Sequence, residues 1–191
     1  MGAIEKLPSD YREIYSVNLQ KDKKTAIIIN GLALIIGATM IILMNFFIPV
    51  SYLFNMEKGL VNYLLKFLVL MVSIVAYMCL HELVHGITMK LLGTKKVKYG
   101  FTGLYAFAGS DNYYAKKSYI TIAVAPIVVF LFVFAAINLM VPQEWFWVVY
   151  LLQVTNISGA AGDLFVTVKF ARMPKDILVK DSGVGMTVYT K

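Results

Sequence analysis

His81 and His85 are the only two histidines of the chain, and Glu82 directly follows the first of them. On an α-helix, residues four apart point to nearly the same face, so both imidazoles can hold one metal ion. Glu82 would project about 100° around the helix from His81, beside the ion but off the ligand stripe. A carboxylate placed there can take a proton from a metal-bound water. The pattern therefore predicts a hydrolytic zinc centre on a helix, with Glu82 as the general base.

Two histidines leave the zinc site incomplete, because a catalytic zinc usually has three protein ligands and one open position. Among the carboxylates, Asp111 and Asp163 remain as candidates for the third ligand. Asp163 is favoured because it stands in the largely apolar run 157–168, where an unpaired carboxylate would be costly. Its distance from the end of its segment also matches that of the histidines, roughly 14–15 Å at about 1.5 Å per residue. Asp111 stays the alternative.

The composition is that of a membrane protein, with 59% hydrophobic residues and a mean hydropathy of +0.71. About 20 apolar residues are needed to cross a bilayer as a helix. Four segments qualify, at about 26–50, 60–92, 119–141 and 145–170. The third contains Pro126, which would free a backbone carbonyl inside the span. We expect an all-α polytopic membrane protein of about four transmembrane helices, with a small strand or hairpin insertion between spans two and three.

The basic residues indicate how such spans would be oriented. Every Lys and Arg except Lys58 and Lys66 falls in the amino-terminal segment, the middle loop or the carboxyl-terminal end. The positive-inside rule then places both termini in the cytoplasm of a multi-pass plasma-membrane protein. The predicted parts are a cytoplasmic arm (1–24), a four-span metalloprotease-like domain (25–170) and a cytoplasmic tail (171–191). The net charge of +7 is explained by this topology and by attraction of the basic residues to anionic lipids of the bilayer. We therefore expect no nucleic-acid partner.

Two segments have strand-like patterns. Residues 94–116 alternate from Lys96 to Phe101 and are then rich in aromatic residues and glycine, which favours short strands or a hairpin beside the metal site. Such a strand could pair with an extended substrate. In the tail, residues 186–189 suggest a terminal strand after a glycine-rich turn.

Asn156 and Gly159 precede Asp163 on nearly the same helical stripe. Small residues such as Gly159 and Gly162 let helices approach closely, so this stripe is expected to pack against the helix that carries the histidines. Asn156 and Gly159 are therefore candidate substrate-binding or ligand-supporting positions. For Asn156 a purely structural role, bridging two helices, stays open.

Taken together, these motifs resemble the site-2 protease group of intramembrane zinc peptidases. The Gly162-Asp163-Leu164 stretch and the Met173-Pro174-Lys175-Asp176 tail are similar to a family of small bacterial membrane proteins described as zincin peptidases. The resemblance implies a few helices around an embedded zinc and a nearby sheet for the substrate. It also implies His81, His85 and Asp163 as zinc ligands and Glu82 as the base. Site-2 proteases usually present Leu-Asp-Gly at the third ligand, an order that is reversed here.

The sequence thus predicts a zinc-dependent intramembrane endopeptidase that cleaves membrane protein or peptide substrates, with Glu82 activating a zinc-bound water. The alternative is a non-catalytic zinc-binding membrane protein, acting as a receptor, immunity factor or regulatory partner. A structural zinc site needs no base, so the presence of Glu82 favours the enzyme. The sequence does not specify the substrate, its regulation or the oligomeric state.

Overall fold

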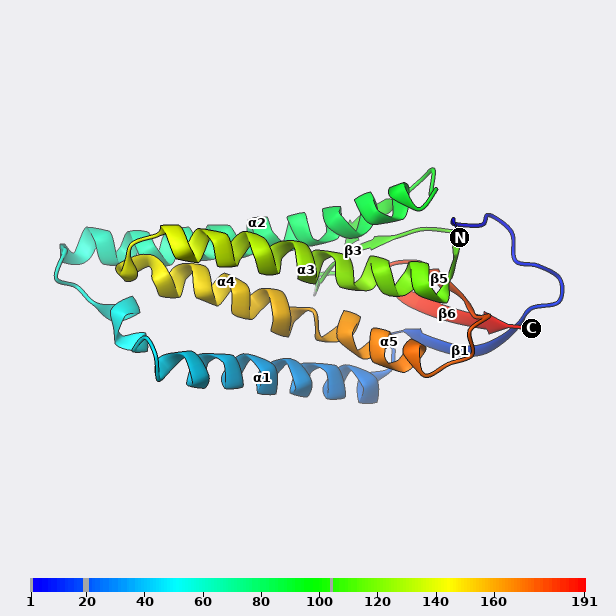
Figure 1. Cartoon of the computed structure of the whole chain (residues 1–191), viewed down its shortest axis with the longest axis horizontal. Helices are drawn as coiled ribbons and strands as arrows, with labels where there is room; N and C mark the ends of the chain where they lie inside the picture. The colour runs from blue at the N-terminus through cyan, green and yellow to red at the C-terminus, as the bar shows by residue number, and fades with distance from the viewer. Residues whose placement is uncertain (1, 19–20, 104) are drawn as a thin grey trace. The chain divides into compact units, whose positions relative to one another are not determined.

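A computed structural model describes residues 2–18, 21–103 and 105–191 of the chain. It is mostly helical, with short strands before α1, between α2 and α3, and after α5 (Figure 1). The helices are α1 (Lys23–Asn45), η1 (Val50–Phe54), α2 (Gly59–Leu91), α3 (Lys116–Met140), η2 (Gln143–Trp145), α4 (Phe146–Gly159) and α5 (Ala161–Ala171). The strands are β1 (Arg12–Asn18), β2 (Lys98–Phe101), β3 (Ala106–Gly109), β4 (Tyr113–Ala115), β5 (Leu178–Asp181) and β6 (Gly185–Thr190).

Three of the four predicted spans are single helices of membrane-crossing length and composition. They are α1, α2 and α3, and their mean hydropathy lies between 2.2 and 2.9. The fourth predicted span, 145–170, is not one helix. It is divided at Ala160, where the backbone leaves the helical conformation and separates α4 from α5. Glycines flank this break at positions 159 and 162, and glycine weakens a helix interior.

The chain forms two compact units. Unit 1 contains Met1–Ile29, Cys79–Pro126 and Gly162–Lys191, and unit 2 contains Asn30–Met78 and Ile127–Ala161. In unit 2, α4 is the buried helix, and Trp147 is fully enclosed. The Trp147 indole donates to the carbonyl oxygens of Ile48 and Pro49 at 3.2 and 3.0 Å, which ties α4 to the end of α1. The Tyr150 hydroxyl makes a similar bond to the Met40 carbonyl.

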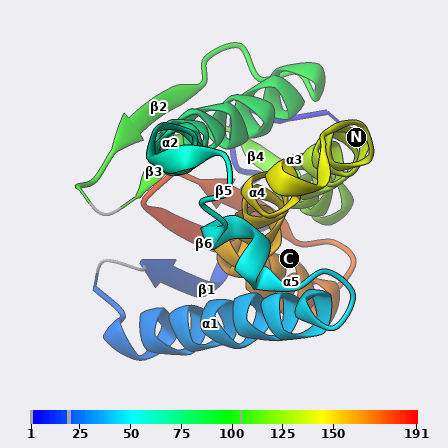
Figure 2. The same ribbon diagram turned by 90° about the vertical axis from the view of Figure 1, so that its left-hand side faces the viewer.

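Unit 1 contains a four-stranded antiparallel sheet with the order β1-β6-β5-β4 (Figure 2). The predicted terminal strand is confirmed as β6, whereas the sequence analysis assigned no strand to the arm that supplies β1. The expectation of an all-α protein is therefore too narrow, because the arm and the tail pair as β1 and β6. The buried core of unit 1 joins residues of this sheet to residues of α2, α3 and α5, and it consists of Met89, Tyr114, Tyr119, Ile122, Ala123, Val166, Phe170, Ile177, Val179 and Val188.

The predicted insertion after the second span is confirmed as the hairpin β2–β3, followed by β4. Glycines allow this hairpin to pack closely. A Cβ at Gly86 of α2 would collide with the hydroxyl of Tyr99 in β2, so the absence of a side chain there admits the tyrosine. At the far end of the hairpin, Gly109 lies against the backbone of Ser182 and Gly183. The hairpin is thus held between α2 and the β5–β6 turn.

Candidate metal centre

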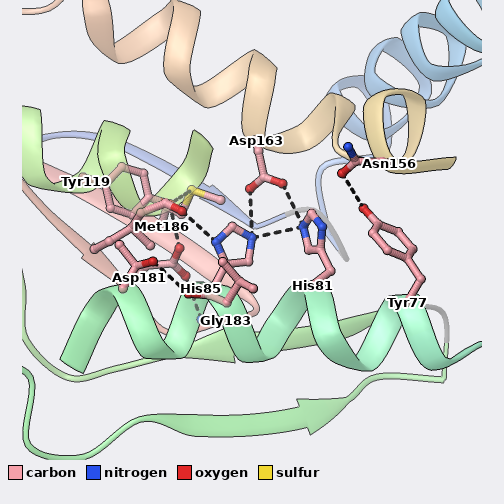
Figure 3. A network of polar contacts seen from close by, with 12 residues as sticks. Tyr77, His81, His85, Tyr119, Asn156, Asp163, Asp181, Gly183 and Met186 are labelled. Carbon is pink, nitrogen blue, oxygen red and sulfur yellow. Dashed lines mark hydrogen bonds and ion pairs between the residues drawn. The ribbon is translucent and has the colours of Figure 1, made fainter. Parts of the chain in front are cut away.

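Unit 1 brings three metal-ligating side chains together, His81 and His85 from α2 and Asp163 from the first turn of α5. The two Nε2 atoms lie 3.2 Å apart. Asp163 faces both rings, with Oδ2 at 3.4 Å from Nε2 of His81 and Oδ1 at 3.6 Å from Nε2 of His85 (Figure 3). Both histidines are buried. Residues 78 positions apart in sequence therefore converge on one small volume.

These spacings fit a zinc ion. Zinc bonds to histidine nitrogen and carboxylate oxygen are about 2.0–2.2 Å long, and the sites are tetrahedral. Two donors at that distance and at the tetrahedral angle are about 3.3–3.5 Å apart. The imidazole nitrogens, 3.2 Å apart, and the two carboxylate contacts, 3.4 Å from Oδ2 to His81 and 3.6 Å from Oδ1 to His85, are close to this value. With one donor atom from each residue, all three donors lie within 4.8 Å of one another. Two neutral imidazoles and one carboxylate also form the donor set expected of a catalytic zinc with an open fourth position.

The Nδ1 atom of His85, which faces away from the cluster, makes the hydrogen bond that usually orients a metal-binding histidine. It lies 2.9 Å from the backbone oxygen of Ile122, and because a carbonyl can only accept, Nδ1 carries the proton. The lone pair of Nε2 then points toward Asp163 and His81. Ile122 is available as an acceptor because Pro126, four residues later in α3, has no N–H to donate to it. The carbonyl freed by Pro126 thus fixes the ring of His85.

Glu82 lies on α2 between the two ligands, and it is half-buried. The backbone N–H of Ala108 in β3 is directed at its carboxylate, and His85 and Asp163 are near enough to act on it electrostatically. A base in this position could take a proton from a water at the open coordination position without itself binding the metal. The β2–β3 hairpin therefore contributes to holding Glu82 as well as lying beside it.

Asp181 falls in the segment predicted as a cytoplasmic tail (171–191), but in the structure it belongs to a strand and its carboxylate is hydrogen-bonded inside unit 1. In β5, its Oδ2 accepts a 2.6 Å hydrogen bond from the Tyr119 hydroxyl, and its Oδ1 accepts one of 2.8 Å from the Gly183 N–H. Burial raises the pKa of the Asp181 carboxyl, although these two hydrogen bonds act in the opposite direction. Asp181 is also near enough to His85 and Asp163 to interact with both of them electrostatically. The strand predicted at residues 186–189, with which β5 pairs, was the nearest signal in the sequence.

The other candidates occupy different surroundings. Asp111, the alternative third ligand, is exposed and forms a 2.7 Å ion pair with Lys98. In unit 2, Asn156 is fully buried; its Oδ1 accepts from the Tyr77 hydroxyl at 3.0 Å, and its Nδ2 donates to the Ile127 carbonyl. This is the helix-bridging arrangement that the sequence left open. Gly159 ends α4, and a Cβ added there would be in ordinary contact with the Thr155 side chain at 3.9 Å.

The fold and the site define a helical protein with membrane-length helices and a histidine–carboxylate centre of the zincin type. A family model described as "Putative zincin peptidase" matches residues 74–178, which is more than half of the chain. The chain belongs to this family, and the family implies zinc as the metal. The matched range contains all three ligands of the cluster.

A curated relative from Pyrococcus woesei, named "Uncharacterized 24.7 kDa protein in gap 5'region", is 31% identical over 158 residues. The match covers 80% of this chain and 64% of the relative, so the chain spans less than two thirds of that protein's length. No solved structure matches the chain.

Proposed function

We propose that this protein is a zinc-dependent intramembrane endopeptidase, related to the site-2 protease group, that cleaves membrane protein or peptide substrates. The observation that supports this proposal is the convergence of His81, His85 and Asp163, whose ligating atoms lie within 4.8 Å of one another, with Glu82 beside them. Membership of a zincin peptidase family supports the same chemistry. A purely structural zinc site would need no general base.

In this proposal, zinc supplies Lewis acidity toward a water molecule and the scissile carbonyl. Glu82 would take a proton from the water as the water oxygen forms its bond to the carbonyl carbon, and it would then give that proton to the leaving nitrogen as the C–N bond breaks. The Ala108 N–H is directed at the Glu82 carboxylate and favours its charged form, which is the form that accepts the proton. The Ile122 carbonyl keeps the His85 ring in one orientation.

The β2–β3 hairpin is the proposed substrate platform. In the described part of the chain, β2 pairs with β3 and with no other strand, so its second edge is free. Its residues are largely exposed, and Tyr99 and Phe101 are 48% and 67% accessible. An extended peptide can add to such an edge through backbone hydrogen bonds. A helical substrate segment would have to unwind first, which directs cleavage to segments of low helix stability.

The membrane placement is also a proposal. Three helices of membrane-crossing length support a multi-pass protein, and α4 and α5 together would complete a fourth passage. The distribution of lysine and arginine supports cytoplasmic termini in a plasma membrane.

Glu82→Gln tests the proposal directly. Wild type and variant would be reconstituted in vesicles with a library of quenched fluorescent apolar peptides. We expect the variant to keep its zinc and to lose cleavage by about 10²- to 10⁴-fold, the usual contribution of a general base. Cleavage by Glu82→Gln at the wild-type rate would refute this mechanism. If wild-type protein bound zinc but cleaved no peptide of the library, the non-catalytic receptor or regulatory function would be favoured instead.

A further inference from the structure

A cavity of ≈ 220 Å³ lies in unit 2, and no residue of the metal cluster lines it. It is formed where η1 and the start of α2 meet η2, the turn that joins α3 to α4. Figure 1 shows this turn at the same end of the unit as the first residues of α2. Most of the side chains that line the cavity are charged or carry an amide. Such a lining is unusual for a helical unit that is otherwise apolar.

Lys66 is the deepest charged group of this lining. Its side chain is on the second turn of α2 and is 1% exposed. Among the described residues, no hydrogen bond or ion pair engages its ammonium group. Burying an ammonium group without a partner is energetically costly. An anion bound next to Lys66 would remove this cost.

The neighbouring charged residues do not supply that anion. The carboxylate of Glu144 is paired with Lys58, with the two closest N–O distances at 2.8 and 2.9 Å. Glu57 also lines the cavity, but it is exposed, so solvent screens its charge. Asn62 lies one turn before Lys66 on the same face of α2, and Gln143 lies across the cavity on η2. The amide groups of these two residues can donate to further oxygen atoms of an anion.

The position of the cavity relates it to a membrane surface. Aromatic residues of the kind that gather at membrane–water interfaces surround this end of unit 2, namely Phe46, Phe47, Tyr52, Phe54, Tyr63, Trp145 and Phe146. Lys58 and Lys66 are also the two basic residues that the positive-inside pattern leaves on the outer side. Both of them line the cavity. Their retention there, against the general bias, indicates a local use for positive charge.

We propose that this cavity binds the phosphate group of a phospholipid headgroup, with the Lys66 ammonium as its ion-pair partner. The Asn62 and Gln143 amides would donate to the remaining phosphate oxygens. Apolar side chains on the first turns of α2 are widely exposed, with Leu60 at 60%, Val61 at 82% and Leu64 at 56%. They offer a surface for the acyl chains of the same lipid. The site is separate from the peptidase chemistry and does not depend on it.

Native mass spectrometry of the full chain, released from mild detergent, would test this site. The protein would be titrated with phosphatidylglycerol and, separately, with diacylglycerol of the same acyl chains. We expect wild type to bind the phospholipid and Lys66→Gln to bind it about tenfold to a hundredfold more weakly, as for loss of a hydrogen bond to a charged group. Lys66→Arg should restore binding. Lys90→Gln, which removes an exposed lysine from the same helix, should bind as wild type does.

Equal phospholipid affinity of wild type and Lys66→Gln would overturn the proposal. The wild type alone provides a second test if Lys66→Gln does not fold, because diacylglycerol binding as tight as phospholipid binding would exclude recognition of the phosphate. A third titration would use inorganic phosphate in the absence of lipid. If the free ion bound with the same dependence on Lys66 while the phospholipid did not bind, the lipid source would be wrong.

Discussion

The backbone oxygen of Ile122 accepts its hydrogen bond from the His85 imidazole, at a distance of 2.9 Å. In an uninterrupted helix, that oxygen would instead accept from the N–H four residues later. Position 126 is a proline, so no such donor exists. Pro126, which supplies no ligand to the metal cluster, thereby determines which nitrogen of His85 carries the proton.

Replacing Pro126 with alanine should weaken zinc binding while it strengthens the helix. The new N–H at position 126 would compete with His85 for the Ile122 carbonyl, and loss of such an orienting bond typically costs about 10- to 100-fold in metal affinity. Zinc affinity would be measured in detergent by competition with a chelator. Pro142→Ala, at the start of η2, is the matched control and should leave the affinity unchanged. Equal affinities for Pro126→Ala and wild type would contradict the role given to Pro126.

The ligand set predicts how zinc content responds to single substitutions. Purified wild type should contain about one zinc ion per chain, and His81→Ala and Asp163→Ala should each lose it, because two remaining ligands do not form a stable site. Elemental analysis of the detergent-purified proteins would measure this. Asp111→Asn should retain the metal, since Asp111 is ion-paired with Lys98 at the surface. Loss of zinc from Asp111→Asn with retention in Asp163→Ala would reverse the assignment.

Asp181 predicts a pH dependence of stability in the metal-free protein. Burial raises the pKa of this carboxyl in the folded state, so folding favours its protonated form. The resulting stabilisation is fully present below the ordinary carboxyl pKa and is lost as the pH rises through the raised value. The thermal midpoint of wild type, relative to Asp181→Asn, should therefore fall as the pH rises from acidic to neutral.

The Asp181 comparison would use thermal unfolding of chelator-treated protein in detergent. Asparagine can still accept from the Gly183 N–H through its oxygen, and the Tyr119 hydroxyl can turn to accept from its amide. Asp111→Asn is the control, because the pKa of the Asp111 carboxyl is lowered by Lys98 and its trend should run the opposite way. A constant difference between wild type and Asp181→Asn across this pH range would argue against a buried, perturbed Asp181.

Gly109→Ala should destabilise unit 1. The added methyl group would meet the backbone of Ser182 and Gly183, which cannot rotate away as a flexible side chain would. Overpacking of this kind costs about 1–3 kcal/mol. Gly31→Ala in α1 is the control, because a Cβ there meets nothing within 4 Å, and a helical alanine should add up to about 1 kcal/mol. Chemical denaturation of both variants would show whether the hairpin is held at Gly109.

The sequence predicted best those features that depend on one helix. The placement of His81, Glu82 and His85 follows from the period of an α-helix and needs no knowledge of the rest of the chain. Asp163 could also be selected, because a carboxylate in an apolar run is costly without a partner. The hairpin after α2 was predicted from its alternation and its glycines, which are likewise local signals.

Features that depend on pairing between distant segments were missed. β1 and Asp181 belong to a sheet that joins residues 12–18 to residues 185–190. The sequence of neither segment indicates that the two would pair. The break at Ala160 was also missed, because hydropathy averaged over a long window does not register a local change of backbone conformation. For Asn156 the sequence left two roles open, and the contact that favours helix bridging, with the Tyr77 hydroxyl 79 positions earlier in the chain, could not be inferred from it.

The separation between His85 and Asp163 also bears on biosynthesis. The ribosome completes both histidines long before it reaches α5, and a nascent chain that ends before residue 163 lacks the third donor. A metal ion can therefore be held by all three donors only after translation has passed the first turn of α5. Any shorter nascent chain lacks the cross-link that a bound metal would make between α2 and α5.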